Sequence, residues 1–161
     1  MAIAYSKFDC YWCQLMNDGI YTLANDAVYD QLVALLNSIE ANAETDFPVC
    51  VIAFNERLYK VRAEVAARSQ VMLLEDREIL QRWRSFSTQV WQTHPTALQQ
   101  WRAKGISGVY RLNYNHRYAA FDPDAPFDRF LYLDADTLLL GSPKRFFENL
   151  DRHDFVTYDF Q

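Results

Sequence analysis

The chain of 161 residues contains only three cysteines. A disulfide framework needs cysteines in pairs, so this small, odd number predicts that disulfides do not hold the fold together. Cys10 and Cys13, in CYWC, have the spacing of a redox or metal motif. Zinc would need four ligands, however, and Cys50 with scattered histidines supplies no second pair. A thioredoxin-like site would follow a strand, whereas CYWC precedes the first predicted one. We therefore expect packed or free thiols in a reduced, cytoplasmic protein.

Long apolar runs and basic blocks are also missing. No run approaches the roughly 20 residues that span a bilayer, and the N-terminus lacks the basic and apolar regions of a secretory signal. The net charge of −5 is spread over the chain, which argues against a nucleic-acid partner. Repeats, low-complexity tracts and Gly/Ser linkers are absent. With half of its residues apolar, the chain is expected to form one domain, residues 19–161, after an N-terminal extension, residues 1–18.

The apolar residues follow strand and helix patterns in alternation. Strands are expected at residues 19–26, 48–54, 71–74 and 130–133, and a strand-like run follows at 154–160. Helices are expected at residues 28–39, 58–65, 75–91, 108–121 and 144–150. The alternation, with short connections, predicts an α/β fold whose mostly parallel central sheet is flanked by helices on both faces.

Spacing within the predicted helices indicates their inner faces and ends. Asn25 or Asp26 is a natural N-cap for the first helix, and Ser142 and Pro143 are expected to cap and begin the last one. The apolar positions expected to face the core are Val28, Leu32, Leu35, Leu36 and Ile39 in the first helix, Leu80, Trp83, Val90 and Trp91 in the third, and Leu112, Tyr118 and Phe121 in the fourth.

Two carboxylates follow the fourth predicted strand, in RFLYLDADTLLLGSP. Burying a carboxylate is costly unless its charge is compensated, so Asp134 and Asp136 need a partner. Residues two apart in a strand point to the same side, and two carboxylates suit Mg²⁺, Mn²⁺ or Ca²⁺ completed by water and substrate phosphates. A D-x-D pair alone is a weak signal. Apolar neighbours argue against a solvated turn here, a role expected instead for Asp122, Asp124 and Asp128.

Polar residues also follow the first predicted strand, at Asn25 and Asp26. In open parallel sheets, ligands bind beyond the carboxyl ends of the strands. We therefore expect these two residues to share one edge of the sheet with Asp134 and Asp136, and the two polar pairs to form a binding site.

The stretch FLYLDADTLLLGSP resembles the D-x-D signature of GT-A-fold glycosyltransferases, in particular of the family-eight type (glycogenin and bacterial galactosyltransferase relatives). YTLANDAVYDQLVALLNSI is similar to that family's opening strand and helix, and GSPKRFFENL to the short helix after its motif. The family carries an arginine 17 residues before the first Asp, a separation that Arg117 has from Asp134. The resemblance covers roughly residues 19–161. It implies a Rossmann-like domain that transfers a sugar from a nucleotide-diphospho-sugar, a UDP-sugar, to an acceptor hydroxyl with Mn²⁺ or Mg²⁺.

The resemblance also implies roles for individual residues. Asp136 would bind the metal, and Asp134 the metal or the donor ribose. Arg117 would contact the donor's phosphates or sugar. The remaining positions assigned to substrate binding are Leu23, Ala24, Asn25 and Asp26 at the base, and Ala135 within the motif. The residues themselves leave simpler alternatives open, since Arg117 suits an exposed helix position and the polar pair at 25–26 suits helix caps.

The chain departs from the family after the motif, because it ends 25 residues beyond Asp136. The family's second half supplies a metal-binding histidine and the acceptor pocket. His153 lies too early to match that histidine, and His94 and His116 precede the motif. We expect a nucleotide-sugar-binding portion that is incomplete at its C-terminus, with an unknown acceptor.

Two other functions are compatible with parts of the sequence. A non-catalytic nucleotide-binding or interaction domain would use the four tryptophans and many tyrosines as an exposed apolar face, which predicts self-association. A haloacid-dehalogenase-type phosphatase also carries a D-x-D at a strand end, but wants Thr or Val four residues after the first Asp. Leu138 stands there, Thr137 comes one residue early, and the phosphatase motif belongs on a first strand.

Overall fold

The computed structural model describes residues 18–43, 47–94, 96–105, 115–154 and 156. Its strands are β1 (Asp18–Ala24), β2 (Val49–Ala53), β3 (Val71–Leu74) and β4 (Arg129–Tyr132). Its helices are α1 (Tyr29–Asn42), α2 (Tyr59–Ala66), α3 (Arg77–Thr93), α4 (Ala97–Ala103) and α6 (Lys144–Leu150), with 3₁₀ helices η1 (Asp26–Val28) and η2 (Asn115–Phe121). Cys10, Cys13, Leu112 and most of the run at 154–160 lie outside the described residues.

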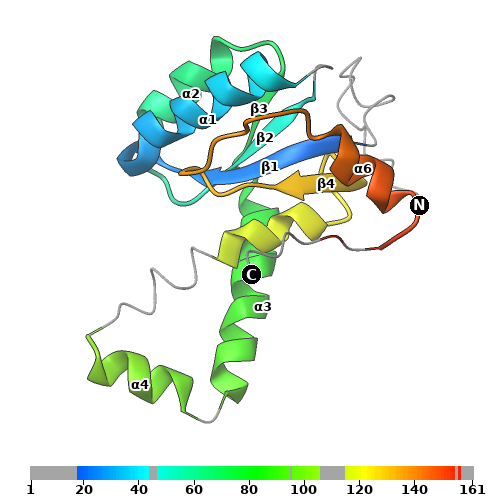
Figure 1. Cartoon of the computed structure of the whole chain (residues 1–161). Helices are drawn as coiled ribbons and strands as arrows, with labels where there is room; N and C mark the ends of the chain where they lie inside the picture. Colours follow the sequence, from blue (N-terminus) through cyan, green and yellow to red (C-terminus); the bar gives the residue numbers. More distant parts are fainter. Residues whose placement is uncertain (1–17, 44–46, 95, 106–114, 155, 157–161) are drawn as a thin grey trace, which may run out of the picture.

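All four strands belong to one parallel sheet in the order β3-β2-β1-β4. Helices α1 and α2 cover one face, and η2 with the first part of α3 lies against the other (Figure 1). This confirms the predicted α/β fold. β2 is buried along its whole length, as expected for a central strand, whereas β4 forms an edge of the described sheet and is half-buried. None of the described helices is long and apolar enough to cross a membrane.

Two apolar layers hold the helices against the sheet, because successive side chains along a strand point to opposite faces. On one face, α1 contributes the buried residues Leu32, Leu35, Leu36 and Ile39, as its spacing predicted. Ile20 of β1 joins this layer, and its neighbour Tyr21 joins the opposite one. The opposite layer includes Ile79 of α3 together with Ala119 and Ala120 of η2.

The winding of the sheet reverses between β1 and β4. From β1 the chain moves outward to β2 and β3, with α1 and α2 on one face, and then returns past β1 to β4 with α3 and η2 on the other. The register pairs Asp18 with Arg129 and Tyr21 with Tyr132. In open α/β sheets, ligands bind beyond the carboxyl ends of the strands at such a reversal.

Phe127 leaves no room for a side chain at Gly19 of β1. A Cβ atom at this position would overlap Cδ2 of the buried Phe127 ring. We expect Gly19→Ala to lower the free energy of unfolding by about 1–3 kcal/mol, measured by urea denaturation. Gly141→Ala is the matched control, because no heavy atom lies within 4 Å of its added Cβ. Equal stability of the two variants would contradict the packing of Phe127 over β1.

For α3, the prediction of which residues face the core was wrong in the second half of the helix. Val90 is 47% exposed, because α3 projects away from the sheet (Figure 1). Leu80 and Trp83, nearer the start of α3, do pack against the buried layer. Trp91 is half-buried, and its ring lies 4.2 Å from that of Trp101 in α4, a helix that the sequence did not predict.

The predicted inner face of the next helix was also wrong. Tyr118 and Phe121 are 39% and 62% exposed. The described part of this segment is a 3₁₀ helix, whose three residues per turn bring His116, Ala119 and Ala120 inward instead. The last helix covers the expected residues Lys144–Leu150, but Pro143, expected as its first residue, stands at the N-cap position in place of Ser142.

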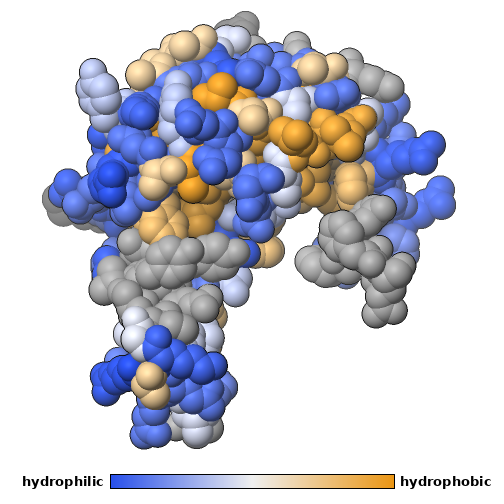
Figure 2. Space-filling view, turned by 60° about the vertical axis from the view of Figure 1, so that its left-hand side comes forward, coloured by the Kyte–Doolittle hydropathy of each residue, from blue (hydrophilic) through white to orange (hydrophobic). Residues whose placement is uncertain are grey.

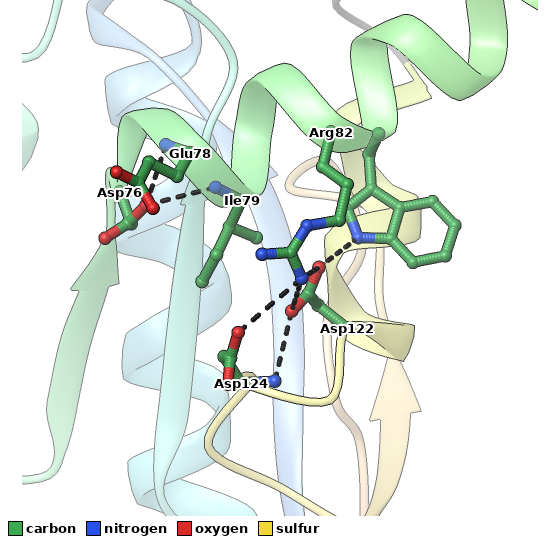
Figure 3. A network of polar contacts seen from close by, with 7 residues as sticks. Asp76, Glu78, Ile79, Arg82, Asp122 and Asp124 are labelled. Atoms are coloured by element: carbon green, nitrogen blue, oxygen red, sulfur yellow. Dashed lines mark hydrogen bonds and ion pairs between the residues drawn. The ribbon is translucent and has the colours of Figure 1, made fainter. Parts of the chain in front are cut away.

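Asp122, expected in a solvated turn, is instead buried and holds α3 against the loop before β4 (Figure 3). Nη1 of Arg82 lies 2.9 Å from both of its carboxylate oxygens. Nε1 of Trp83 donates a hydrogen bond of 2.8 Å, and the backbone N–H of Asp124 donates another of 3.0 Å. The exposed Asp124 and Asp128 fit the prediction, and the buried Asp122 corrects it.

Candidate functional site

The polar pair after β1 is used to cap two different helices. Asn25 is buried, and its Oδ1 accepts a hydrogen bond of 3.0 Å from the backbone N–H of Ala27 in η1, which leads into α1. Asp26 instead caps α2, a helix far along the chain. Its carboxylate accepts hydrogen bonds from the backbone N–H groups of Tyr59, Lys60 and Val61, at 2.9, 3.0 and 3.2 Å. The Nδ2 group of Asn25 is therefore available to donate a hydrogen bond to a ligand. The Asp26 carboxylate is already used by the backbone N–H groups of α2.

Loss of the Asp26 cap would leave the first N–H groups of α2 without their acceptor. We expect Asp26→Ala to lower the free energy of unfolding by about 1–2 kcal/mol, measured by urea denaturation. Asp30→Ala is the matched control, because Asp30 is an exposed aspartate in the first turn of α1. A loss no larger than that of the control would contradict the capping role.

The side chains of Leu23 and Ala24 are buried, at 8% and 1% exposed. The carbonyl oxygen of Ala24 already accepts a hydrogen bond of 2.9 Å from Phe54 N–H. Any contact that these two residues make with a ligand would therefore use the remaining backbone groups.

The carboxylates after β4 lie in a tight turn and are exposed to solvent. Backbone N–H and Oγ1 of Thr137 donate hydrogen bonds of 3.0 and 2.6 Å to the carbonyl oxygen of Asp134. Asp134 and Asp136 are both exposed, which corrects the expectation that their apolar neighbours exclude a solvated turn. Because the strand ends at Tyr132, the period of a strand does not set the directions of these side chains.

Packing on α1 orients this turn. Ala135 and Leu139 are buried in the layer formed with α1, so the side chain of Ala135 faces the core. Leu139 N–H donates to Oγ of Ser38, and the Leu139 carbonyl accepts from Nδ2 of Asn42, each at 2.9 Å. The apolar residues around the motif thus anchor its backbone and leave the two carboxylates in water.

Hydrophobic side chains remain exposed near the motif in the sequence. Leu138 and Leu140 are 58% and 85% exposed. Figure 2, which turns the carboxyl ends of the strands toward the viewer, shows hydrophobic side chains gathered on the body of the molecule, whose surface is otherwise mostly hydrophilic. These residues offer an apolar surface close to the two carboxylates in sequence.

Arg117 is half-buried on η2 and lies against β4. Its Cζ is 5.5 Å from the ring centroid of Tyr132, a residue two positions before Asp134. Burial raises the pKa of the Tyr132 hydroxyl, an effect that the neighbouring Arg117 charge opposes. Arg117 therefore lies beside the strand that carries the motif. Sequence reasoning did not single out Tyr132, because it stands in an apolar run and gives no signal of its own.

The two aspartates fit one kind of metal site. Among the described residues, no group of three or more His, Cys, Asp or Glu side chains could hold a metal ion. Two exposed carboxylates suit a hard divalent ion such as Mg²⁺ or Mn²⁺ only when water and substrate phosphates complete its shell. The donor set therefore fits an ion that binds together with a phosphorylated ligand.

No protein-family model matches the chain, and the search of curated proteins gave no match.

Proposed function

We propose that this domain binds a UDP-sugar through a divalent metal ion and transfers its sugar to an acceptor hydroxyl. The observation that carries the proposal is the exposed pair Asp134 and Asp136, which follows β4 at the reversal of the sheet. Asn25 directly follows the neighbouring strand β1, and Arg117 lies against β4. Carboxylates, an amide donor and an arginine near the carboxyl ends of two adjacent parallel strands support a nucleotide-diphosphate ligand.

Each residue of the proposed donor site has a distinct task. Asp134 and Asp136 would hold Mn²⁺ or Mg²⁺, which neutralises the charge that builds up on the departing diphosphate. Arg117 would add a fixed positive charge at the phosphates or the sugar. Asn25 would direct its Nδ2 donor to the base, and Asp26 would keep the turn after β1 in place by capping α2.

A binding domain without transfer activity is the second candidate. The exposed Leu138 and Leu140 favour it, because exposed apolar residues suit a contact with another chain. This second candidate is a nucleotide-binding or interaction domain, and only the first candidate releases UDP from a UDP-sugar when an acceptor is present.

The proposed function is tested by calorimetric titration of UDP into the protein, once with Mn²⁺ and once with EDTA. We expect saturable binding with Mn²⁺ and its loss with EDTA, because the exposed carboxylates alone repel the diphosphate. Binding that is equally strong in EDTA would contradict the metal site. A folded protein that binds no UDP under either condition would contradict the nucleotide site. UDP release from a panel of UDP-sugars then separates transfer from binding alone.

Removing the Arg117 charge is expected to weaken the donor site without abolishing it. We expect Arg117→Ala to weaken UDP-sugar binding by about 1–3 kcal/mol, the range for a hydrogen bond to a charged group. Arg145→Ala is the matched control, because Arg145 is exposed on α6. Calorimetric affinities that agree among wild type and both variants would assign Arg117 to the packing of η2 on β4.

A further inference from the structure

A cavity lies beyond the carboxyl ends of β2 and β3, and neither Asp134 nor Asp136 belongs to its lining. Its volume is about 880 Å³, and its lining includes Ala53 at the end of β2, Glu75 after β3, and His116 of η2. Since β1 separates β2 from β4 and neighbouring strands are about 4.8 Å apart, β2 and β4 are separated laterally by roughly 10 Å. The cavity is large enough for a small metabolite.

Two arginines line this cavity without an acidic partner. Arg77 and Arg84 are seven residues apart on α3, so they lie on one face of the helix two turns apart. In the part of the chain that the structure describes, neither forms an ion pair. The third lining arginine, Arg62, differs, because its Nη2 lies 2.6 Å from a carboxylate oxygen of Glu75. Arg77 and Arg84 therefore remain available to an anionic ligand.

His116, which also lines the cavity, leaves a buried hydrogen-bonding atom unused. The residue is 6% exposed, and its Nδ1 lies 3.1 Å from the carbonyl oxygen of Ala53, so this nitrogen carries the proton and donates. Burial, and to a smaller extent the nearby Arg84 charge, lowers the pKa of His116 and favours the neutral ring. Nε2 is then an acceptor, and it has no partner among the described residues. A ligand hydroxyl would supply the missing donor.

The remaining lining residues include two carboxylates that supply acceptors. Glu56 and Glu78 are exposed and form no ion pair with a described residue. Carboxylate oxygens accept hydrogen bonds from hydroxyl groups. The cavity thus combines two available guanidinium groups with several acceptors, a set that matches a ligand with one anionic group and several hydroxyls.

We propose that this cavity binds a small sugar phosphate, with Arg77 and Arg84 at the phosphate and the acceptors of Glu56, Glu78 and His116 at the hydroxyls. Two guanidinium groups on one helix face can approach a phosphate from both sides, each with paired N–H donors. This site needs no metal ion. It therefore differs in chemistry from the proposed metal site after β4, although Ala53 in its lining pairs with Ala24, the residue before Asn25.

Calorimetry in EDTA with three probes tests the site: glucose 6-phosphate, inorganic phosphate and glucose. We expect glucose 6-phosphate to bind about tenfold more tightly than either of the others, because only it engages both the arginines and the acceptors. Arg84→Gln should weaken its binding about tenfold, whereas Arg102→Gln, an exposed arginine on α4, should leave it unchanged. Binding should also persist in Asp136→Ala, which separates this cavity from the donor site.

Three results would overturn the proposal. If glucose 6-phosphate shows no saturable binding, the cavity is not a sugar-phosphate site. If wild type and Arg84→Gln bind it with equal affinity, the ligand binds elsewhere on the protein. If inorganic phosphate binds as tightly as glucose 6-phosphate, the sugar hydroxyls do not contribute to binding. Arg77→Gln repeats the test if circular dichroism shows that Arg84→Gln is unfolded. A proton spectrum gives an independent readout, since the ring signal of His116 should shift on binding while those of His94 and His153 stay in place.

Discussion

Replacing Asp136 by alanine is expected to weaken Mn²⁺-dependent UDP binding about 100-fold, to the level measured in EDTA. Asp136 is exposed in the turn after β4 and contributes one of the two carboxylates available there. An ion held by only two carboxylates has little affinity when one is lost, because water and phosphate cannot replace its charge. Ala135, which anchors this turn in the core, is retained, so the protein should stay folded.

A calorimetric titration of UDP at fixed Mn²⁺ measures this loss, with the urea midpoint as a test of folding. Asp128→Ala is the matched control, because Asp128 is an exposed aspartate that precedes the same strand. It should bind UDP like the wild type, and Asp134→Ala should resemble Asp136→Ala. If Asp136→Ala binds UDP with the affinity of the wild type, the proposed metal site and the proposed donor site are both contradicted.

Asp122→Ala is expected to lower the free energy of unfolding by about 3 kcal/mol. The Asp122 side chain is fully buried and accepts hydrogen bonds from Arg82, Trp83 and the backbone of Asp124. Its removal leaves the half-buried indole N–H of Trp83 without an acceptor and opens a gap between α3 and the loop before β4. Arg82 is 51% exposed and can return to water, so most of the loss comes from the other two donors.

Urea denaturation measures this effect, and Asp124→Ala is the matched control. Asp124 is 69% exposed and lies 3.5 Å from Arg82, so its removal should cost less than about 1 kcal/mol. Trp83→Phe removes one donor from the same carboxylate. In a double-mutant cycle it should therefore couple to Asp122→Ala. Equal stability of the Asp122 and Asp124 variants would show that the buried carboxylate does not hold α3 in place.

Local patterns in the sequence predicted the strands of the sheet and the helix α1 that covers one of its faces. The continuous apolar run at residues 48–54 became the buried central strand β2. The spacing of Leu32, Leu35, Leu36 and Ile39 identified the buried face of α1. These elements were predictable because each is buried along one face or throughout, so its hydrophobic period appears directly in the sequence.

Contacts between distant segments decided what the patterns could not. Asp26 caps α2, and Asp122 binds side chains of α3, although in sequence both resemble ordinary turn residues. The apolar frame of Asp134 and Asp136 indicated burial, but only Ala135 and Leu139 enter the core. A linear pattern does not show which side of a turn meets a neighbouring helix.

The sequence by itself determined the alternation of strands and helices, and it placed polar residues after the first and fourth strands. Only the tertiary structure decided that β1 and β4 are neighbours at the reversal of the sheet, which brings those polar residues to one edge. It also assembled the cavity around Arg77, Arg84 and His116, residues that no motif connects. The physical reason is that strand order and helix docking depend on burial summed over the whole chain, whereas each local pattern reports only its own segment.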